Sequence, residues 1–258
     1  MKTALVALAK DEDKYIDEWL QYNLKLGFND IFVFQNDWKY TGELKADNIH
    51  FIDLPGERIQ NKCYNDFLIN NSKNYDFIAF FDIDEFLILK KHKTINEYLE
   101  TQTNSNLIYV NWRLFGDNGL KEVENNNYSV LERFTKCGSN LYRLGKNIIR
   151  TNKIDVRFYN PHIVCKAGIL QLPTYNDTVG NVFETQPWNT DNKNEQDVEL
   201  FHYRNKTYQE CYDRKFKKRE VFWGDGQWVD INRFNTEFDN HNQNDIENTL
   251  ARDFLYAK

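Results

Sequence analysis

Two acidic residues placed two apart, Asp82 and Asp84, are the side chains of this sequence best suited to chemistry. They follow a strongly hydrophobic run over residues 77–81, and if that strand continues through them, both carboxylates project to one face. Neighbouring carboxylates repel each other unless a cation neutralises them. Mg²⁺ and Mn²⁺ suit such a site, with substrate phosphates and water completing the coordination shell. The pair therefore predicts a divalent cation that stabilises charge on a departing diphosphate, although aspartate is also common in turns at strand ends.

The elements that must position this pair alternate between strand and helix. Strands are expected over residues 3–9, 30–35, 50–54, 77–81 and 107–112, and helices over 14–26 and 60–70. The first helix has Asp11 or Asp13 available as N-cap and Gly27 as its end. Long polar loops follow, and the last fifty residues have a helical pattern that is clearest over 207–222. The order predicts an α/β protein with a mostly parallel, doubly wound sheet and a helical C-terminal region.

Polar residues follow four of these strands at their carboxyl ends. They are Lys10 and Asp11, Asn36 and Asp37, Asp53, and the Asp82/Asp84 pair. Ligands of such sheets bind beyond the carboxyl ends of the strands. We therefore expect these side chains to share one rim.

Composition narrows the class of protein. The chain has 258 residues, of which 41% are hydrophobic, so disorder is not expected. A net charge of −6 argues against a general nucleic-acid binder. The short apolar N-terminus followed by Lys10-Asp11-Glu12-Asp13 indicates a buried strand rather than a signal peptide. The four cysteines form no CxxC pair, which predicts reduced thiols and a cytoplasmic protein.

Four segments together resemble glycosyltransferase family 92 and related bacterial proteins of the GT-A type. They occur in the family's order across roughly residues 10–220: KDEDKYIDEWL with the following LGF, FDIDEFL, WRLFGDNG, and HYRNKT. Asp11 stands where the family usually has Asn, and Asp117 and Asn118 replace small residues of the third motif.

This resemblance implies a single GT-A domain, with a nucleotide-sugar-binding half at 1–112, an acceptor-side half at 113–206 and a C-terminal helical segment at 207–258. It also implies Mn²⁺ or Mg²⁺, a nucleoside-diphosphate sugar donor such as UDP-galactose or another UDP-hexose, and inversion at the sugar carbon. By position, the metal ligands would be Asp82, Asp84 and His202; the donor would contact Lys10, Asp11, Glu12, Asn36, Gln60, Asn65, Asp82 and Lys206; and the sugar and acceptor would contact Trp112 and Gly116.

Inversion requires a carboxylate base near the acceptor hydroxyl. Asp117 and Glu85 are the two candidates, and Glu85 has the alternative role of orienting the metal pair or closing a turn. His202 and Trp112 could instead belong to the core, and Lys206 could be a solvated charge. His162 is a further candidate histidine.

The acceptor would be a glycan or a lipid-linked glycan used to build cell-surface polysaccharide. Residues 214–223 mix basic and aromatic side chains on an expected helix. They suggest peripheral contact with an anionic membrane from the cytoplasmic side, or a solvated helix face.

Two other functions remain open at this point. A metal-dependent nucleotidyltransferase also places paired aspartates on Mg²⁺, but no glycine-rich phosphate loop precedes Asp82. A non-catalytic carbohydrate-binding protein could share the fold. An aspartyl phosphatase is disfavoured because its DxD would follow the first strand, and this one follows about the fourth.

Overall fold

The structure is a computed structural model that describes residues 1–103, 105–152, 155–166, 175–176, 182–183, 197–217 and 230–257. The chain divides into two compact units. Unit 1 comprises Met1–Trp112 and Tyr142–Leu200, and unit 2 comprises Arg113–Leu141 and Phe201–Lys258. Each unit is described by itself.

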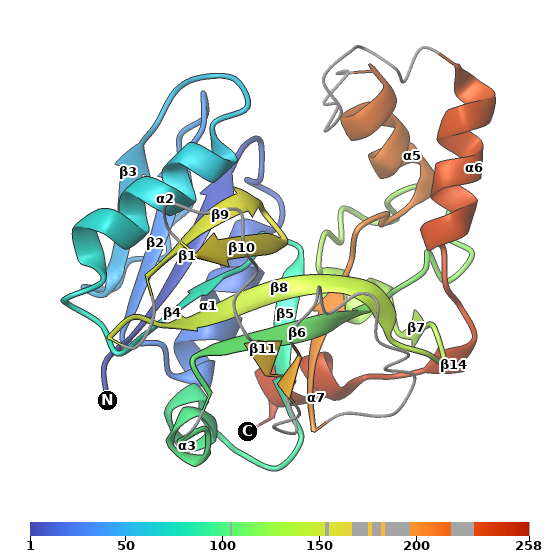
Figure 1. Cartoon of the computed structure of the whole chain (residues 1–258). Coiled ribbons are helices and arrows are strands. Elements are labelled where there is room, and N and C mark those ends of the chain that lie inside the picture. Colours follow the sequence, from blue (N-terminus) through green and yellow to red (C-terminus); the bar gives the residue numbers. More distant parts are fainter. Residues whose placement is uncertain are drawn as a thin grey trace. The chain divides into compact units, whose positions relative to one another are not determined.

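Unit 1 is built on a mixed sheet whose core runs in the order β3-β2-β1-β4-β8-β6 (Figure 1). The strands β1 (Thr3–Ala9), β2 (Asp30–Gln35), β3 (Ile49–Asp53) and β4 (Phe77–Phe80) are parallel. Strand β8 (Tyr142–Arg150) runs antiparallel between β4 and β6 (Leu107–Leu114). Beyond β6 lie β11 (Tyr175–Asn176) and β12 (Val182–Phe183), and β13 (Val198–His202) pairs with β5 (Glu85–Leu89) and β6.

The two long helices of unit 1 follow from this order. The connection from β1 to β2 and that from β3 to β4 step across the sheet in opposite directions. Right-handed crossovers therefore place α1 (Ile16–Leu26) and α2 (Gln60–Asn71) on opposite faces. Helix α2 buries Tyr64, Phe67 and Leu68 in one core cluster with β1 and β4. The expected doubly wound, mostly parallel α/β fold is confirmed.

Helix α1 differs from expectation at its start. It is preceded by Tyr15 without a side-chain cap, so neither Asp11 nor Asp13 is its N-cap. Its end is as expected, because Gly27 adopts the left-handed conformation that ends the helix. A short helix α3 (Ile95–Thr101) and the antiparallel pair β9 (Val156–Asn160) and β10 (Ile163–Lys166) complete the described elements of this unit.

Unit 2 carries the helical C-terminal region that the sequence predicted. Its elements are α4 (Val130–Arg133), β7 (Lys136–Cys137), α5 (Tyr208–Cys211), a π-helical turn (Tyr212–Lys217), α6 (Ile231–His241), β14 (Ile246–Glu247) and α7 (Leu250–Tyr256). Phe234 and Phe238 of α6 pack with Cys211 in a small aromatic core. Residues 218–222 of the expected helix lie outside the described part of the chain.

The four cysteines are free thiols, and all are buried. No helix among the described residues is long and apolar enough to span a membrane.

Candidate functional site

The acidic pair lies in a turn rather than on a continuing strand. Strand β4 ends at Phe80, and the amide of Glu85 donates to the carbonyl of Asp82 at 3.1 Å, which closes a turn over Ile83 and Asp84. The expectation that both carboxylates project from one strand face is therefore wrong. Glu85 then begins β5.

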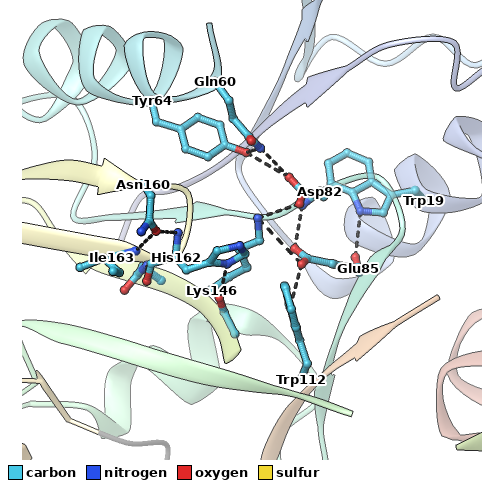
Figure 2. A network of polar contacts seen from close by, with 12 residues as sticks. Trp19, Gln60, Tyr64, Asp82, Glu85, Trp112, Lys146, Asn160, His162 and Ile163 are labelled. Atoms are coloured by element: carbon cyan, nitrogen blue, oxygen red, sulfur yellow. Dashed lines mark hydrogen bonds and ion pairs between the residues drawn. The ribbon is translucent and has the colours of Figure 1, made fainter. Parts of the chain in front are cut away.

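Asp82 is held by three side chains from two other elements (Figure 2). Its Oδ1 accepts hydrogen bonds from Gln60 Nε2 at 2.9 Å and from the Tyr64 hydroxyl at 3.3 Å, both on α2. Its Oδ2 accepts from Lys146 Nζ at 2.7 Å. Gln60, which the resemblance placed on the donor, thus lies beside this aspartate. The neutralising cation beside Asp82 is a lysine that the sequence did not single out.

Glu85 joins three of the four sequence motifs. Its backbone carbonyl accepts from the Trp19 indole at 2.9 Å, and its Oε1 accepts from the Trp112 indole at 2.7 Å. Its Oε2 accepts from the amide of Asp82 at 2.8 Å. The Glu85 side chain is fully buried, and both of its carboxylate oxygens already accept hydrogen bonds. It therefore cannot reach an acceptor hydroxyl. Of the two roles expected for Glu85, the geometry favours closing the turn and orienting the pair over acting as the base.

Lys146 reaches the turn from β8, the strand that runs against its neighbours. The register pairs Ala79 with Ile148, and two further residues along it place Lys146 beside the point where β4 ends. The preceding Gly145 makes this possible, since a Cβ there would lie 1.9 Å from the carbonyl oxygen of Val110 on β6. The strand can pass so close to β6 only because this residue has no side chain.

The charges of this network act on one another. Burial alone would lower the pKa of the Lys146 ammonium, but Asp82, Glu85 and Asp84 together raise it above its usual value. Burial raises the pKa of Glu85 well above its usual range, and Lys146 opposes that shift. The lysine is therefore protonated at neutral pH and serves as the cation of the site.

His162, the additional candidate histidine, lies beside this network (Figure 2). Its Nδ1 is 3.0 Å from the carbonyl oxygen of Gly145, so this nitrogen carries the proton. Its ring meets that of Trp112 edge to face at a centroid distance of 5.0 Å. Trp112 is itself buried, and its indole is held by Glu85, which fits a core residue better than an open stacking surface.

The remaining donor candidates of unit 1 lie after strand ends or, for Asn65, within α2, and most of their observed contacts are with the chain itself. Lys10 and Asp11 are exposed, and Asp11 has a left-handed backbone that Asp tolerates better than most residues. Glu12 is buried, and its carbonyl begins the turn before α1.

The two asparagine candidates make hydrogen bonds to the backbone of other segments. Asn36 donates to the carbonyls of Leu54 and Gly56. Asn65 exchanges two hydrogen bonds with the backbone of Phe158, which binds α2 to β9. Contact of these residues with a donor stays a prediction.

Four predicted residues belong to unit 2. Asp117 is buried, and its Oδ1 accepts from the amide of Gly119 at 2.8 Å, so its carboxylate shapes its own loop. Gly116 leaves room for the Asn244 side chain, which a Cβ would overlap. His202 is buried at the end of β13, and Lys206 is buried with a left-handed backbone immediately before α5. Their roles beside Asp82 and Asp84 stay predictions.

The comparison with protein families decides the assignment of the chain. The sequence profile of "Glycosyltransferase family 92" matches residues 29–254, which is most of the chain. The chain belongs to glycosyltransferase family 92. The matched residues include the turn that Glu85 organises, and by family the chain is a glycosyltransferase. No curated protein matches it.

Three solved structures illustrate the remaining likenesses. The chain is similar to Rv0371c of Mycobacterium tuberculosis H37Rv, solved with manganese, at 10% identity and a TM-score of 0.31 over 43% of this chain and 65% of that one. It thus spans less than two thirds of that protein. A 2-C-methyl-D-erythritol 4-phosphate cytidylyltransferase of Francisella tularensis is 16% identical at a TM-score of 0.36, over 58% and 73% of the chains. Galactosyltransferase LgtC, solved with donor and acceptor sugar analogs, is 15% identical at 0.26, over 42% and 46%. Scores this low carry no weight for the fold or the function.

The site fits a divalent cation in a more limited way than expected. Among the described residues, no group of three or more His, Cys, Asp or Glu side chains could hold a metal ion. Asp82 already has an ammonium on one oxygen and two hydrogen-bond donors on the other. Asp84 is the second carboxylate, with 9% of its surface exposed. One carboxylate together with substrate phosphates and water is a common way to hold Mg²⁺.

The sequence pattern missed Lys146 and Tyr64. Both lie in segments whose sequence patterns are typical of a helix or a strand, and a single tyrosine or lysine within such a pattern does not by itself indicate a functional site. The one available signal was the pair Gly145-Lys146 inside a strand that continues as Asn-Ile-Ile, because a glycine within a strand often marks a close backbone approach.

Proposed function

We propose that this chain transfers a hexose from a nucleoside-diphosphate sugar to a glycan or lipid-linked glycan acceptor, with inversion at the sugar carbon. The donor would be a UDP-hexose, and UDP-galactose is the first to test. The observation that carries the proposal is the polar turn at the carboxyl end of β4, where Asp82 and Asp84 lie in a chain of glycosyltransferase family 92. Ligands of parallel sheets bind at this edge.

The residues of the turn would bind and orient the donor. Gln60, Tyr64 and Lys146 hold the Asp82 carboxylate in one orientation, so a donor meets a group whose position is already fixed. The Glu85 carboxylate holds the turn itself by accepting a hydrogen bond from the amide of Asp82. Asp84 would take Mn²⁺ or Mg²⁺ together with the donor diphosphate. A bound divalent ion would stabilise the negative charge of the departing nucleotide.

Binding is the first test of this proposal. Thermal unfolding would be measured with UDP, GDP and CMP, each with and without Mn²⁺, on wild type and on Asp84→Ala. A ligand of the folded state raises its stability by mass action. We expect UDP with Mn²⁺ to raise the midpoint of wild type and not that of Asp84→Ala. Asp155→Ala is the matched control, because it removes a largely exposed aspartate of the same unit and should respond as wild type does.

Catalysis is the second test. Metal-dependent release of UDP from UDP-galactose in water would show donor turnover, and galactose appearing on an added glycan together with released UDP would identify a transferase. Binding without any turnover would favour the carbohydrate-binding alternative. Release of pyrophosphate from a nucleoside triphosphate and a sugar phosphate would favour a nucleotidyltransferase, and no stabilisation by any nucleotide would overturn the proposal.

A further inference from the structure

Lys146 is a buried cation at a place where the sequence pattern predicts a bound metal. Its Nζ lies 2.7 Å from Asp82 Oδ2 and 3.9 Å from Glu85 Oε1, and its side chain is 0% exposed. Asp82 is 26% exposed and Glu85 is fully buried. The ammonium thus lies between the acid that faces the rim and the acid that supports the turn.

Such an arrangement contributes little to stability by itself. Lysine is almost never fully buried without a charged partner. Replacing a buried ion pair by apolar side chains of similar volume is often neutral or stabilising, because the charges lose their hydration. Strands β6 and β8 approach closely at Gly145 and set Lys146 beside the end of β4. The backbone therefore brings this cation to the end of β4.

We propose that Lys146 is the permanent counter-ion of Asp82 and divides the work of the acidic pair. Asp82 is then not a metal ligand, and Asp84 is the only carboxylate of the turn that takes a divalent cation. Lys146 acts through Asp82 and is a positioning residue. The inference deepens the proposed function and rests on it, because the role of the metal in donor binding comes from that proposal. Its test measures metal binding alone and needs neither donor nor turnover.

The test measures Mn²⁺ affinity by calorimetry without nucleotide. Lys146→Met keeps the length of the side chain and removes its charge, so Asp82 is left without its counter-ion. We expect this variant to bind Mn²⁺ about tenfold more tightly than wild type, because loss of a nearby positive charge strengthens the attraction of a cation. The gain should vanish in Lys146→Met/Asp82→Asn, where Asp82 can no longer become a ligand. Asp82→Asn alone should weaken Mn²⁺ binding by up to about tenfold, because it removes a nearby negative charge but no ligand, whereas Asp84→Ala should abolish binding. A merely structural lysine would give no dependence of the gain on Asp82.

A second buried pair of unit 1 supplies the matched control. Lys90 Nζ lies 2.6 Å from Glu199 Oε1, and Glu199 is fully buried. Lys90→Met removes a positive charge from a buried carboxylate without touching the turn, and it should leave Mn²⁺ affinity unchanged. Far-ultraviolet circular dichroism establishes that each variant is folded. If Lys146→Met fails to fold, the comparison of Asp82→Asn with Asp84→Ala still decides.

Two results would overturn the inference. One is a loss of Mn²⁺ binding in Asp82→Asn as complete as in Asp84→Ala, since Asp82 would then be a ligand. The other is an unchanged or weaker affinity in folded Lys146→Met. Neither result depends on UDP-sugar turnover, so failure of this inference and failure of the proposed function are distinguishable.

Discussion

Each unit of the chain contains a buried ion pair next to a family motif, and the two pairs are built differently. In unit 2, Arg133 donates from Nη1 and Nη2 to the two carboxylate oxygens of Glu210 at 2.8 and 3.0 Å. Its Nε and Nη2 also donate to the carbonyls of Ser129 and Tyr128. In unit 1, Lys146 offers one ammonium to Asp82 and Glu85.

The difference shows what each pair is for. A planar guanidinium that is bidentate on a carboxylate fixes an orientation, whereas an ammonium is a compact point charge. Glu210 also closes the capping box of α5 with Thr207, directly after the HYRNK segment. The pair of unit 2 therefore fixes backbone geometry, and the pair of unit 1 sets the charge at the rim.

The largest effect should come from breaking the pair of unit 2. Arg133→Ala leaves Glu210 as an uncompensated carboxylate, and we expect the free energy of unfolding to fall by about 3–5 kcal/mol. Urea unfolding followed by circular dichroism measures this change. Arg252→Ala removes an arginine of the same unit from an exposed pair with Asp253, and it should leave stability unchanged within error. Equal losses in both variants would mean that Glu210 does not depend on its partner.

The next largest effect should come from displacing Lys146 without altering it. Gly145→Ala places a Cβ against the backbone of Val110, which cannot yield as a side-chain tip could. We expect a loss of about 3 kcal/mol in unfolding free energy, at the upper end of the cost of overpacking, together with loss of Mn²⁺-dependent UDP binding. Gly138→Ala in unit 2 is the matched control, because its Cβ would meet nothing closer than 3.4 Å. A tolerated Gly145→Ala would contradict the idea that the close approach at this glycine brings the lysine to the end of β4.

A smaller, pH-dependent effect should distinguish unit 2. Burial lowers the pKa of His241 to about 4, with Arg204 adding to the shift, Glu237 opposing it, and Lys215 and His202 lowering it further. Between the ordinary value near 6.5 and this one, the unfolded chain binds a proton that the folded unit does not, so stability falls as pH falls. We expect about 2 kcal/mol to be lost between pH 8 and pH 5 through this group.

The measurement compares wild type with His241→Gln. The difference between their unfolding free energies should shrink as pH falls, because the variant has no proton to gain. A constant difference from pH 8 to pH 5 would show that His241 titrates alike in the folded and unfolded chain.

The sequence predicted the parallel part of the sheet well, for reasons visible in particular strands. Residues 3–9 and 77–80 are buried on both faces, and continuous apolar runs report such strands directly. Gly27 ended its helix as expected. The turn after Phe80 was only the alternative to a continuing strand, because it depends on the Glu85 carboxylate accepting from the Asp82 amide, an interaction that spacing does not encode.

Of the candidate site, the sequence predicted the acidic motif at residues 82–84 but not the residues that other strands bring to it. Asp82 follows from the rule that ligands bind at strand carboxyl ends, whereas Gln60 was expected only from the family resemblance, and the two side chains meet at 2.9 Å. Lys146 comes from the antiparallel strand, whose place between β4 and β6 is fixed by pairing over long sequence separations. A short pattern carries no information about that pairing, so the counter-ion could be found only in three dimensions.

The smallest predicted effect distinguishes a tyrosine that orients Asp82 from a tyrosine that only packs in the core of unit 1. Tyr64 and Tyr22 are both buried, and each donates one hydroxyl hydrogen bond, to Asp82 Oδ1 at 3.3 Å and to the carbonyl of Leu87 at 2.8 Å. Tyr64→Phe and Tyr22→Phe should each lower the free energy of unfolding by about 1 kcal/mol. Only Tyr64→Phe should also weaken UDP binding, by a few-fold, because Asp82 then keeps Gln60 and Lys146 but loses one of the groups that orient it. If both variants bind UDP equally well, the orientation of Asp82 is set by Lys146 and Gln60 without the tyrosine, and the charge of the rim matters more than its geometry.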